Sequence, residues 1–145
     1  MWWKNAHLQL RSRLYFLHPL SYARLLLFSH PQAVPYNRQV QDADDVDIDH
    51  LVPLYEVHIS GGHSWNHDKK RAFANDMGAN SPLRITHRWT NRIPKNADDP
   101  TFYSPSYVPA RCSYLYDWIT IKRKWQLSMD PKEANAIRKQ IRACV

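Results

Sequence analysis

Long apolar runs are missing from this chain of 145 residues. None approaches the roughly 20 residues that cross a bilayer, so we expect no stable membrane span. The hydrophobic stretch 14–29 is interrupted by His18, Pro19 and Arg24, which makes it a poor signal-peptide core. Generic disorder is also excluded, because 43% of the residues are hydrophobic and 12% are aromatic.

Cysteine is scarce as well. Cys112 and Cys144 are the two cysteines, and they lie far apart, without the local spacing of a zinc site. Two alternatives follow. They are buried free thiols, or they form a disulfide that suits an oxidising compartment and whose loop the chain-entropy model values at roughly 3.7 kcal/mol.

Acidic residues are absent from residues 1–41, and the composition changes abruptly at Asp42-Ala43-Asp44-Asp45. This change predicts a basic N-terminal extension (1–41), with an amphipathic helix at 11–28, followed by one domain (42–145). Over the whole chain 20 Lys and Arg oppose 13 Asp and Glu, giving a net charge of +7. That excess favours nucleic acid or an anionic membrane as partner, and the simplest alternative is a soluble basic protein.

Short strand patterns alternate with helical patterns in the predicted domain, which indicates an α+β fold. Helix caps are expected at Asn66 and at Asp130, where Glu133 would complete a capping box. The expected strands are 46–54 and 83–86, and the expected helices are 55–60, 68–76, 112–126 and a last one beginning after residue 130.

The strand at residues 46–54 carries Asp49 followed at once by His50. A one-metal nuclease uses such residues: a carboxylate holds a hard divalent cation, and a neutral imidazole takes a proton from water. Adjacent strand residues face opposite ways, so a pair that converges on one phosphate needs a bend there.

Further motifs follow in order along the chain. They are Asp47-Ile48-Asp49-His50-Leu51-Val52-Pro53-Leu54, Ser60-Gly61-Gly62 with Trp65, Arg71 to Asp76, Asn80, Asn91-Arg92, Lys95, Asp99-Pro100, Cys112-x-Tyr114, Trp118-Ile119-x-Ile121-Lys122 and Cys144. Together they resemble the secreted HNH endonuclease family of fungi and bacteria, related to the C-terminal nuclease domain of GmrSD-type restriction enzymes. The resemblance covers about residues 46–145.

The resemblance implies a ββα-metal (HNH) finger with additional C-terminal helices, and an extracellular, metal-dependent endonuclease. The expected cofactor is one divalent ion, Mg²⁺ or Mn²⁺. The expected substrate is DNA, cut with little sequence specificity, with RNA as a second option, and the protein would be a monomer or weak oligomer. Asp49 and Asn91 would be metal ligands, His50 the general base and Asn80 a brace of the site, with His50, Asn80 and Asn91 as the catalytic residues. Nucleic acid would contact Arg92, Lys95, Lys122, Arg123 and Lys124, and a disulfide would join Cys112 to Cys144.

Two departures from the family keep other functions open. The family's Lys-Gly-Asp is here Lys95-Asn96-Ala97 after Pro94, and the family's upstream segment is not recognisable in residues 1–41. A catalytically impaired nucleic-acid-binding remnant is therefore the second hypothesis. A membrane-associated basic protein that uses residues 1–28 is the third.

Structural roles are the alternative for each of these residues. Asp49 could cap a strand end, Asn80 could be an ordinary turn former and Lys95 a solvated surface lysine. His63 and His67, four residues apart, allow a zinc site or simply exposed histidines. The Lys122-Arg123-Lys124 cluster is either a solvated helix face or a phosphate-tracking surface.

Overall fold

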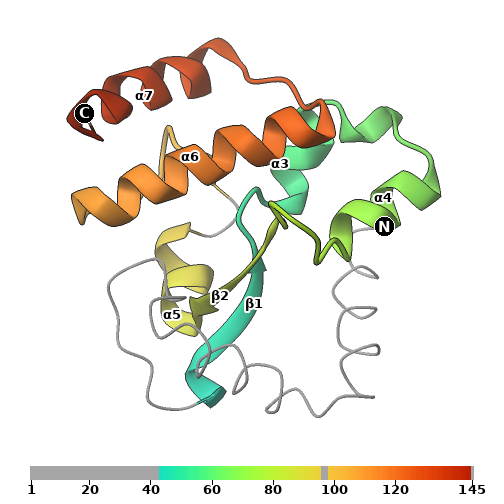
Figure 1. The fold of residues 1–145 in the computed structure, drawn as a ribbon, viewed down its shortest axis with the longest axis horizontal. Coiled ribbons are helices and arrows are strands. Elements are labelled where there is room, and N and C mark those ends of the chain that lie inside the picture. Colours follow the sequence, from blue (N-terminus) through green and yellow to red (C-terminus); the bar gives the residue numbers. More distant parts are fainter. Residues whose placement is uncertain (1–42, 96–97, 145) are drawn as a thin grey trace.

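The computed structural model describes residues 43–95 and 98–144 (Figure 1). The predicted N-terminal extension lies outside the described residues. The principal elements are β1 (Val46–His50), α3 (Leu54–Ile59), α4 (His67–Ala74), β2 (Leu83–His87), α5 (Arg88–Thr90), a π-helical turn (Asn91–Lys95), α6 (Val108–Trp125) and α7 (Pro131–Ile141). The expected α+β composition is confirmed.

The sheet consists of β1 and β2, which pair antiparallel with Asp49 opposite Arg84 and His50 opposite Leu83. The connection between the two strands contains α3 and α4, whereas β2 runs directly into α5 and the π-helical turn. The first strand is shorter than expected, because the chain bends at Leu51 and Val52 before α3 begins.

The core is built around α6, which lies between α7 and the sheet in Figure 1. One face of α6 is buried. It carries Leu115, Trp118 and Ile121, which are spaced three residues apart, and Tyr114, which precedes Trp118 by four; all four side chains are at most 1% exposed. They pack with buried side chains from the rest of the domain: Leu51, Val52, Val57, Phe73, Leu127 and Ile137. Burial of this face holds α6 against the segment that follows β1.

The helix ends follow the sequence with one exception. Asn66 accepts a hydrogen bond from Lys69 N at 2.9 Å, as expected of a cap. The carboxylate of Asp130 accepts from the backbone N–H groups of Lys132 and Glu133, and the Glu133 bond is the main reason that the pKa of Asp130 is lowered. The expected capping box is wrong, because Glu133 turns its carboxylate into the core, where Trp118 Nε1 donates to it at 2.6 Å.

A disulfide joins Cys112 in α6 to Cys144 near the C-terminus. The alternative of two free thiols is therefore wrong. The bond ties the beginning of α6 to the segment after α7, which limits how far the two helices can separate. Within the described ranges, no helix is both long enough and apolar enough to cross a bilayer.

Candidate active site

Asp47 and Asp49 lie two residues apart in β1, so their side chains share one face of the strand. The segment after β2 binds this face. Asn91 Nδ2 donates to Asp47 Oδ2 at 3.2 Å. Arg92 donates from Nε and Nη2 to the two oxygens of the same carboxylate, at 2.9 and 3.0 Å. Asp47 therefore fixes the π-helical turn against β1.

Lys95 is the last residue of that turn, and its side chain lies at the carboxylate of Asp49. Its Nζ donates to Asp49 Oδ1 at 3.2 Å and to the carbonyl oxygen of His50 at 2.9 Å, and it lies 2.9 Å from Asp49 Oδ2. Lys95 is 1% exposed and Asp49 is 9% exposed. The expected contact of Lys95 with phosphate is wrong for this conformation, and so is the alternative of a surface lysine, because the ammonium is buried in an ion pair.

His50 faces the other side of β1, toward α4. Its Nε2 lies 3.1 Å from the carbonyl oxygen of Ala74, and its ring stacks on Phe73 with centroids 5.8 Å apart. Because a carbonyl only accepts, Nε2 carries the proton of the neutral ring and Nδ1 is the proton-accepting nitrogen. The imidazole is thus held in one tautomer.

The structure brings together only part of the predicted site. Asp49 and Asn91 lie on the side of β1 that the π-helical turn covers, whereas the His50 ring lies on the side of α4. The expected bend between Asp49 and His50 is not there, because β1 remains extended through both residues. The bend follows at residues 51–52, immediately after the histidine.

Asn80 lies in the turn between α4 and β2. It is exposed and has a φ of 53°, a left-handed conformation that asparagine tolerates better than most residues. These features favour the turn-former alternative. Its side chain makes no hydrogen bond within residues 43–95 and 98–144, so the expected bracing of the site stays a prediction.

Lys122 requires a correction among the expected nucleic-acid contacts. It is 0% exposed, and its ammonium binds the carboxylates of Glu56 and Glu133 together with Ser60 Oγ and the Ser128 carbonyl. A lysine enclosed by two carboxylates cannot contact a phosphate. Its role is to join α3, α6 and α7 inside the core.

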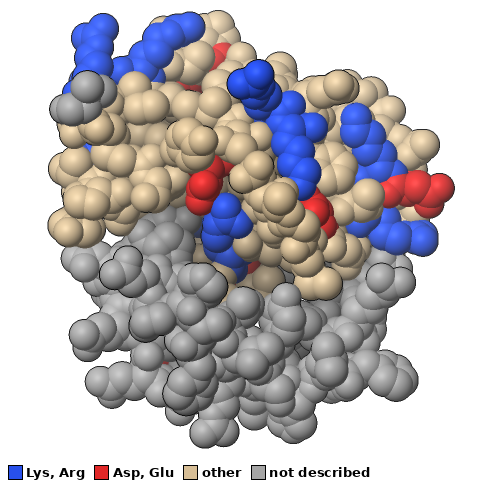
Figure 2. Space-filling view, viewed as in Figure 1, with Lys and Arg blue, Asp and Glu red and all other residues tan. Residues whose placement is uncertain are grey.

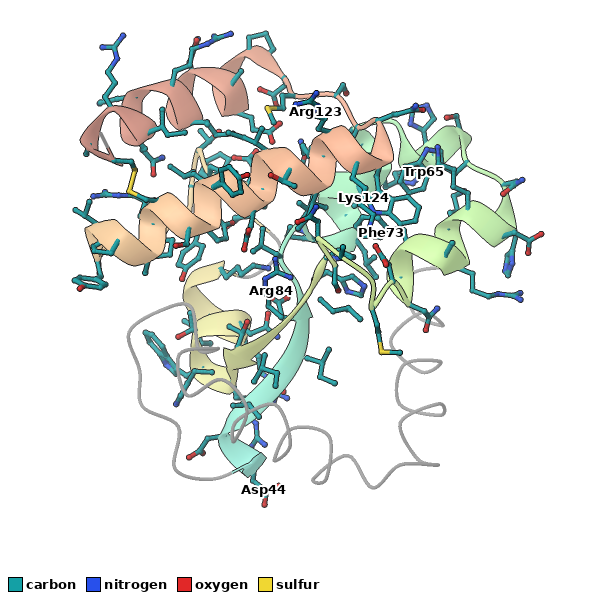
Figure 3. The ribbon with its side chains drawn as sticks, in the orientation of Figure 1. Asp44, Trp65, Phe73, Arg84, Arg123 and Lys124 are labelled. Carbon is teal, nitrogen blue, oxygen red and sulfur yellow. A yellow bond between two sulfur atoms is a disulfide. The ribbon has the colours of Figure 1, made fainter. Side chains whose placement is uncertain are left out.

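Arg123 and Lys124 are exposed, and Figure 3 shows them on different sides of α6. Lys124 forms an ion pair with Asp76 and donates to the carbonyl of Ala79 at 2.7 Å. On the face shown in Figure 2, Lys and Arg side chains form several separate groups rather than one basic field. Arg123 and Arg92 remain exposed candidates for contact with phosphate.

The zinc alternative gains no support. His63 and His67 are both exposed, and the Nδ1 of His63 lies 3.1 Å from the carbonyl of His58. In the part of the chain that the structure describes, no three His, Cys, Asp or Glu side chains gather as a metal site.

Two residues near the site were missed in the sequence. Tyr103 is half-buried, and burial together with the negative charge of Asp49 raises its pKa to about 12, so its hydroxyl stays protonated. No sequence signal places Tyr103 beside Asp49. Asp47, in contrast, could have been found, because it stands two positions before Asp49 in a strand and must share its face.

No family model matches the chain, and no solved structure matches it. A protein of Arthroderma benhamiae named "Uncharacterized secreted protein" is 32% identical to the chain over 102 residues, which cover 70% of this chain and 49% of that protein. The chain thus spans about half the length of the curated relative it matches. The relative's name and the disulfide agree with the expected extracellular location.

Proposed function

We propose that this chain is a metal-dependent endonuclease of the HNH type that hydrolyses phosphodiester bonds in nucleic acid. The order of elements supports this, because two antiparallel strands are followed by a helical segment that binds the first strand, as in a ββα-metal finger. The observation that carries the proposal is the His50 imidazole, held at the end of β1 by the carbonyl of Ala74.

His50 would act as the general base. With Nε2 donating to Ala74, Nδ1 accepts a proton from water, which then attacks phosphorus. The resulting imidazolium keeps its bond to the Ala74 carbonyl, and this bond becomes stronger when the ring is charged. Stacking on Phe73 limits rotation of the ring, so the base remains correctly oriented.

Asp49 and Asn91 would hold the divalent ion. Both supply oxygen, which Mg²⁺ and Mn²⁺ prefer, and few protein ligands suffice because Mg²⁺ keeps several waters. Asn91 Nδ2 donates to Asp47, so the amide oxygen takes no part in that bond and would be the atom offered to the ion. The His50 ring lies on the other side of β1, so the ion and the base would act on one phosphate only after a rearrangement at the end of β1. With that rearrangement, an ion held by Asp49 and Asn91 would supply positive charge to the phosphate and to the leaving oxygen.

The proposed substrate is DNA, with RNA as a second option. The exposed Arg92 and Arg123 would contact phosphates, which carry no sequence information, so little sequence preference is expected. We also propose that the protein acts outside the cell, since a disulfide persists in an oxidising compartment and the relative is named as secreted.

The test is a plasmid-nicking assay with the full chain in Mg²⁺ or Mn²⁺, together with a gel shift. His50→Ala should abolish nicking and leave DNA binding intact, because the imidazole is the proposed base and makes no proposed contact with phosphate. His63→Ala is the matched control, since it removes an exposed imidazole. Nicking by His50→Ala at the rate of the unmodified chain would exclude the proposed base.

A catalytically impaired nucleic-acid-binding protein is the second candidate. The Lys95–Asp49 ion pair favours it, because an ammonium already neutralises the carboxylate that a metal ion would need. DNA retention in the gel shift with no nicking in either metal would favour this candidate over the nuclease.

A further inference from the structure

The carboxylate proposed to hold the metal ion already has a cation of its own. Lys95 Nζ lies 3.2 Å from Asp49 Oδ1 and 2.9 Å from Oδ2, and it also donates to the His50 carbonyl at 2.9 Å. Lys95 is 1% exposed and Asp49 is 9% exposed, so water screens the pair weakly. The ammonium therefore neutralises Asp49 within the protein interior.

A divalent ion at Asp49 would bring two further positive charges to within a few ångströms of this ammonium. Repulsion between charges at such distances is strong where the surroundings are less polarisable than water. The lysine and the divalent ion thus compete for the same carboxylate. The competition follows from the position of Lys95 and requires no change in its protonation.

We propose that Lys95 is a built-in competitor of the divalent ion, so that the ion binds Asp49 only as the ammonium leaves it. This inference rests on the proposed function, because that function assigns the ion to Asp49. The consequence is a low affinity for Mg²⁺ and Mn²⁺, set by Lys95, in a site whose oxygen ligands would otherwise bind them more tightly.

The test measures Mn²⁺ binding by the full chain without nucleic acid. Free Mn²⁺ is followed by electron paramagnetic resonance, and the Mn²⁺-induced rise in Tm is recorded in parallel. Lys95→Met should bind Mn²⁺ at least tenfold more tightly and show a larger rise in Tm, since ligand binding stabilises the folded state. Lys95→Arg keeps the competing charge and should show no gain.

Lys132→Met is the matched control, because it removes the same charge from an exposed position in α7. An affinity of Lys95→Met equal to or below that of the unmodified chain overturns the proposal. If Lys95→Met fails to fold because Asp49 has lost the lysine, the unmodified chain decides: a millimolar Kd for Mn²⁺ supports the proposal, and a micromolar Kd overturns it.

The double variant Asp49→Asn with Lys95→Met removes both charges of the pair. It should lack the tight binding of Lys95→Met, and equally tight binding would overturn the assignment of Asp49 as the contested ligand. These results are separate from those on nuclease activity. Tight Mn²⁺ binding by Lys95→Met, together with no nicking by the unmodified chain, would refute the proposed hydrolysis and leave the competition standing.

Discussion

The strongest prediction about stability concerns the buried ammonium of Lys122 and the free energy of unfolding that is lost when it is removed. Lys122 binds Glu56 Oε1 at 2.7 Å and Glu133 Oε1 at 2.6 Å, and it is 0% exposed. Lys122→Met fills a similar volume but leaves two buried carboxylates without their cation. Breaking a buried ion pair in this way costs about 3–5 kcal/mol. Urea denaturation at neutral pH should show a loss of that size in the free energy of unfolding.

The loss should depend on pH. Burial raises the pKa of Glu133, whereas Lys122 lowers it, so removing the lysine should raise that pKa further. A carboxyl whose pKa is higher in the folded than in the unfolded state binds its proton more tightly when the protein is folded. Its contribution to stability is complete at a pH below the unfolded-state pKa, and it is lost as the pH rises through the folded-state pKa. The defect of Lys122→Met should therefore be largest near pH 7 and shrink as the pH falls toward about 5.

Controls separate this effect from a general loss of charge. Lys132→Met removes an exposed lysine and should change stability by less than about 0.5 kcal/mol. Adding Glu133→Gln to Lys122→Met should recover part of the loss, because one unpaired carboxylate is gone. A loss below about 1 kcal/mol that does not vary with pH would refute the reasoning from buried charge.

Three further predictions concern the rest of the domain. Asp47→Ala should raise the Mg²⁺ concentration needed for nicking, because it releases Asn91, whereas Asp47→Asn keeps an acceptor and should be milder; titration of nicking against Mg²⁺ tests both. Replacing Cys112 and Cys144 by Ser should lower the free energy of unfolding by roughly 3.7 kcal/mol in non-reducing urea denaturation, and an unchanged value would contradict the chain-entropy estimate. Ultraviolet titration should include an ionisation near pH 12, and the amplitude of this ionisation should fall in Tyr103→Phe.

Local patterns predicted the elements well. The caps at Asn66 and Asp130 depend on side chains within three residues, so they could be read directly from the sequence. The strand at 83–86 was also nearly correct, because its alternation needs no knowledge of distant partners. The first strand was predicted four residues too long, since the apolar run Leu51-Val52 continues past the bend into the core.

Charged residues were harder to place, because their partners lie far away in the chain. Glu133 satisfied the capping-box pattern, yet it pairs with Lys122 and Trp118 on another helix. Lys122 looked like part of a surface cluster, although it follows Trp118 by four positions and thus lies on the buried face of α6. That spacing was the available signal.

The sequence predicted which residues belong to the candidate site better than it predicted their contacts. The sequence indicated a strand that carries Asp49 and His50, but it could not show that Lys95 returns from a π-helical turn to neutralise Asp49. The fixed tautomer of His50 depends on the Ala74 carbonyl, 24 residues further along the chain. Contacts of that separation are set by tertiary packing.

The most direct measurement of the central claim is chemical rescue of a His50→Gly variant by added imidazole. If His50 is the general base, the variant should bind plasmid DNA but nick it only when imidazole is supplied, and the rate should follow the concentration of neutral imidazole at fixed Mn²⁺. Nicking by His50→Gly without imidazole at the rate of the unmodified chain would contradict the account.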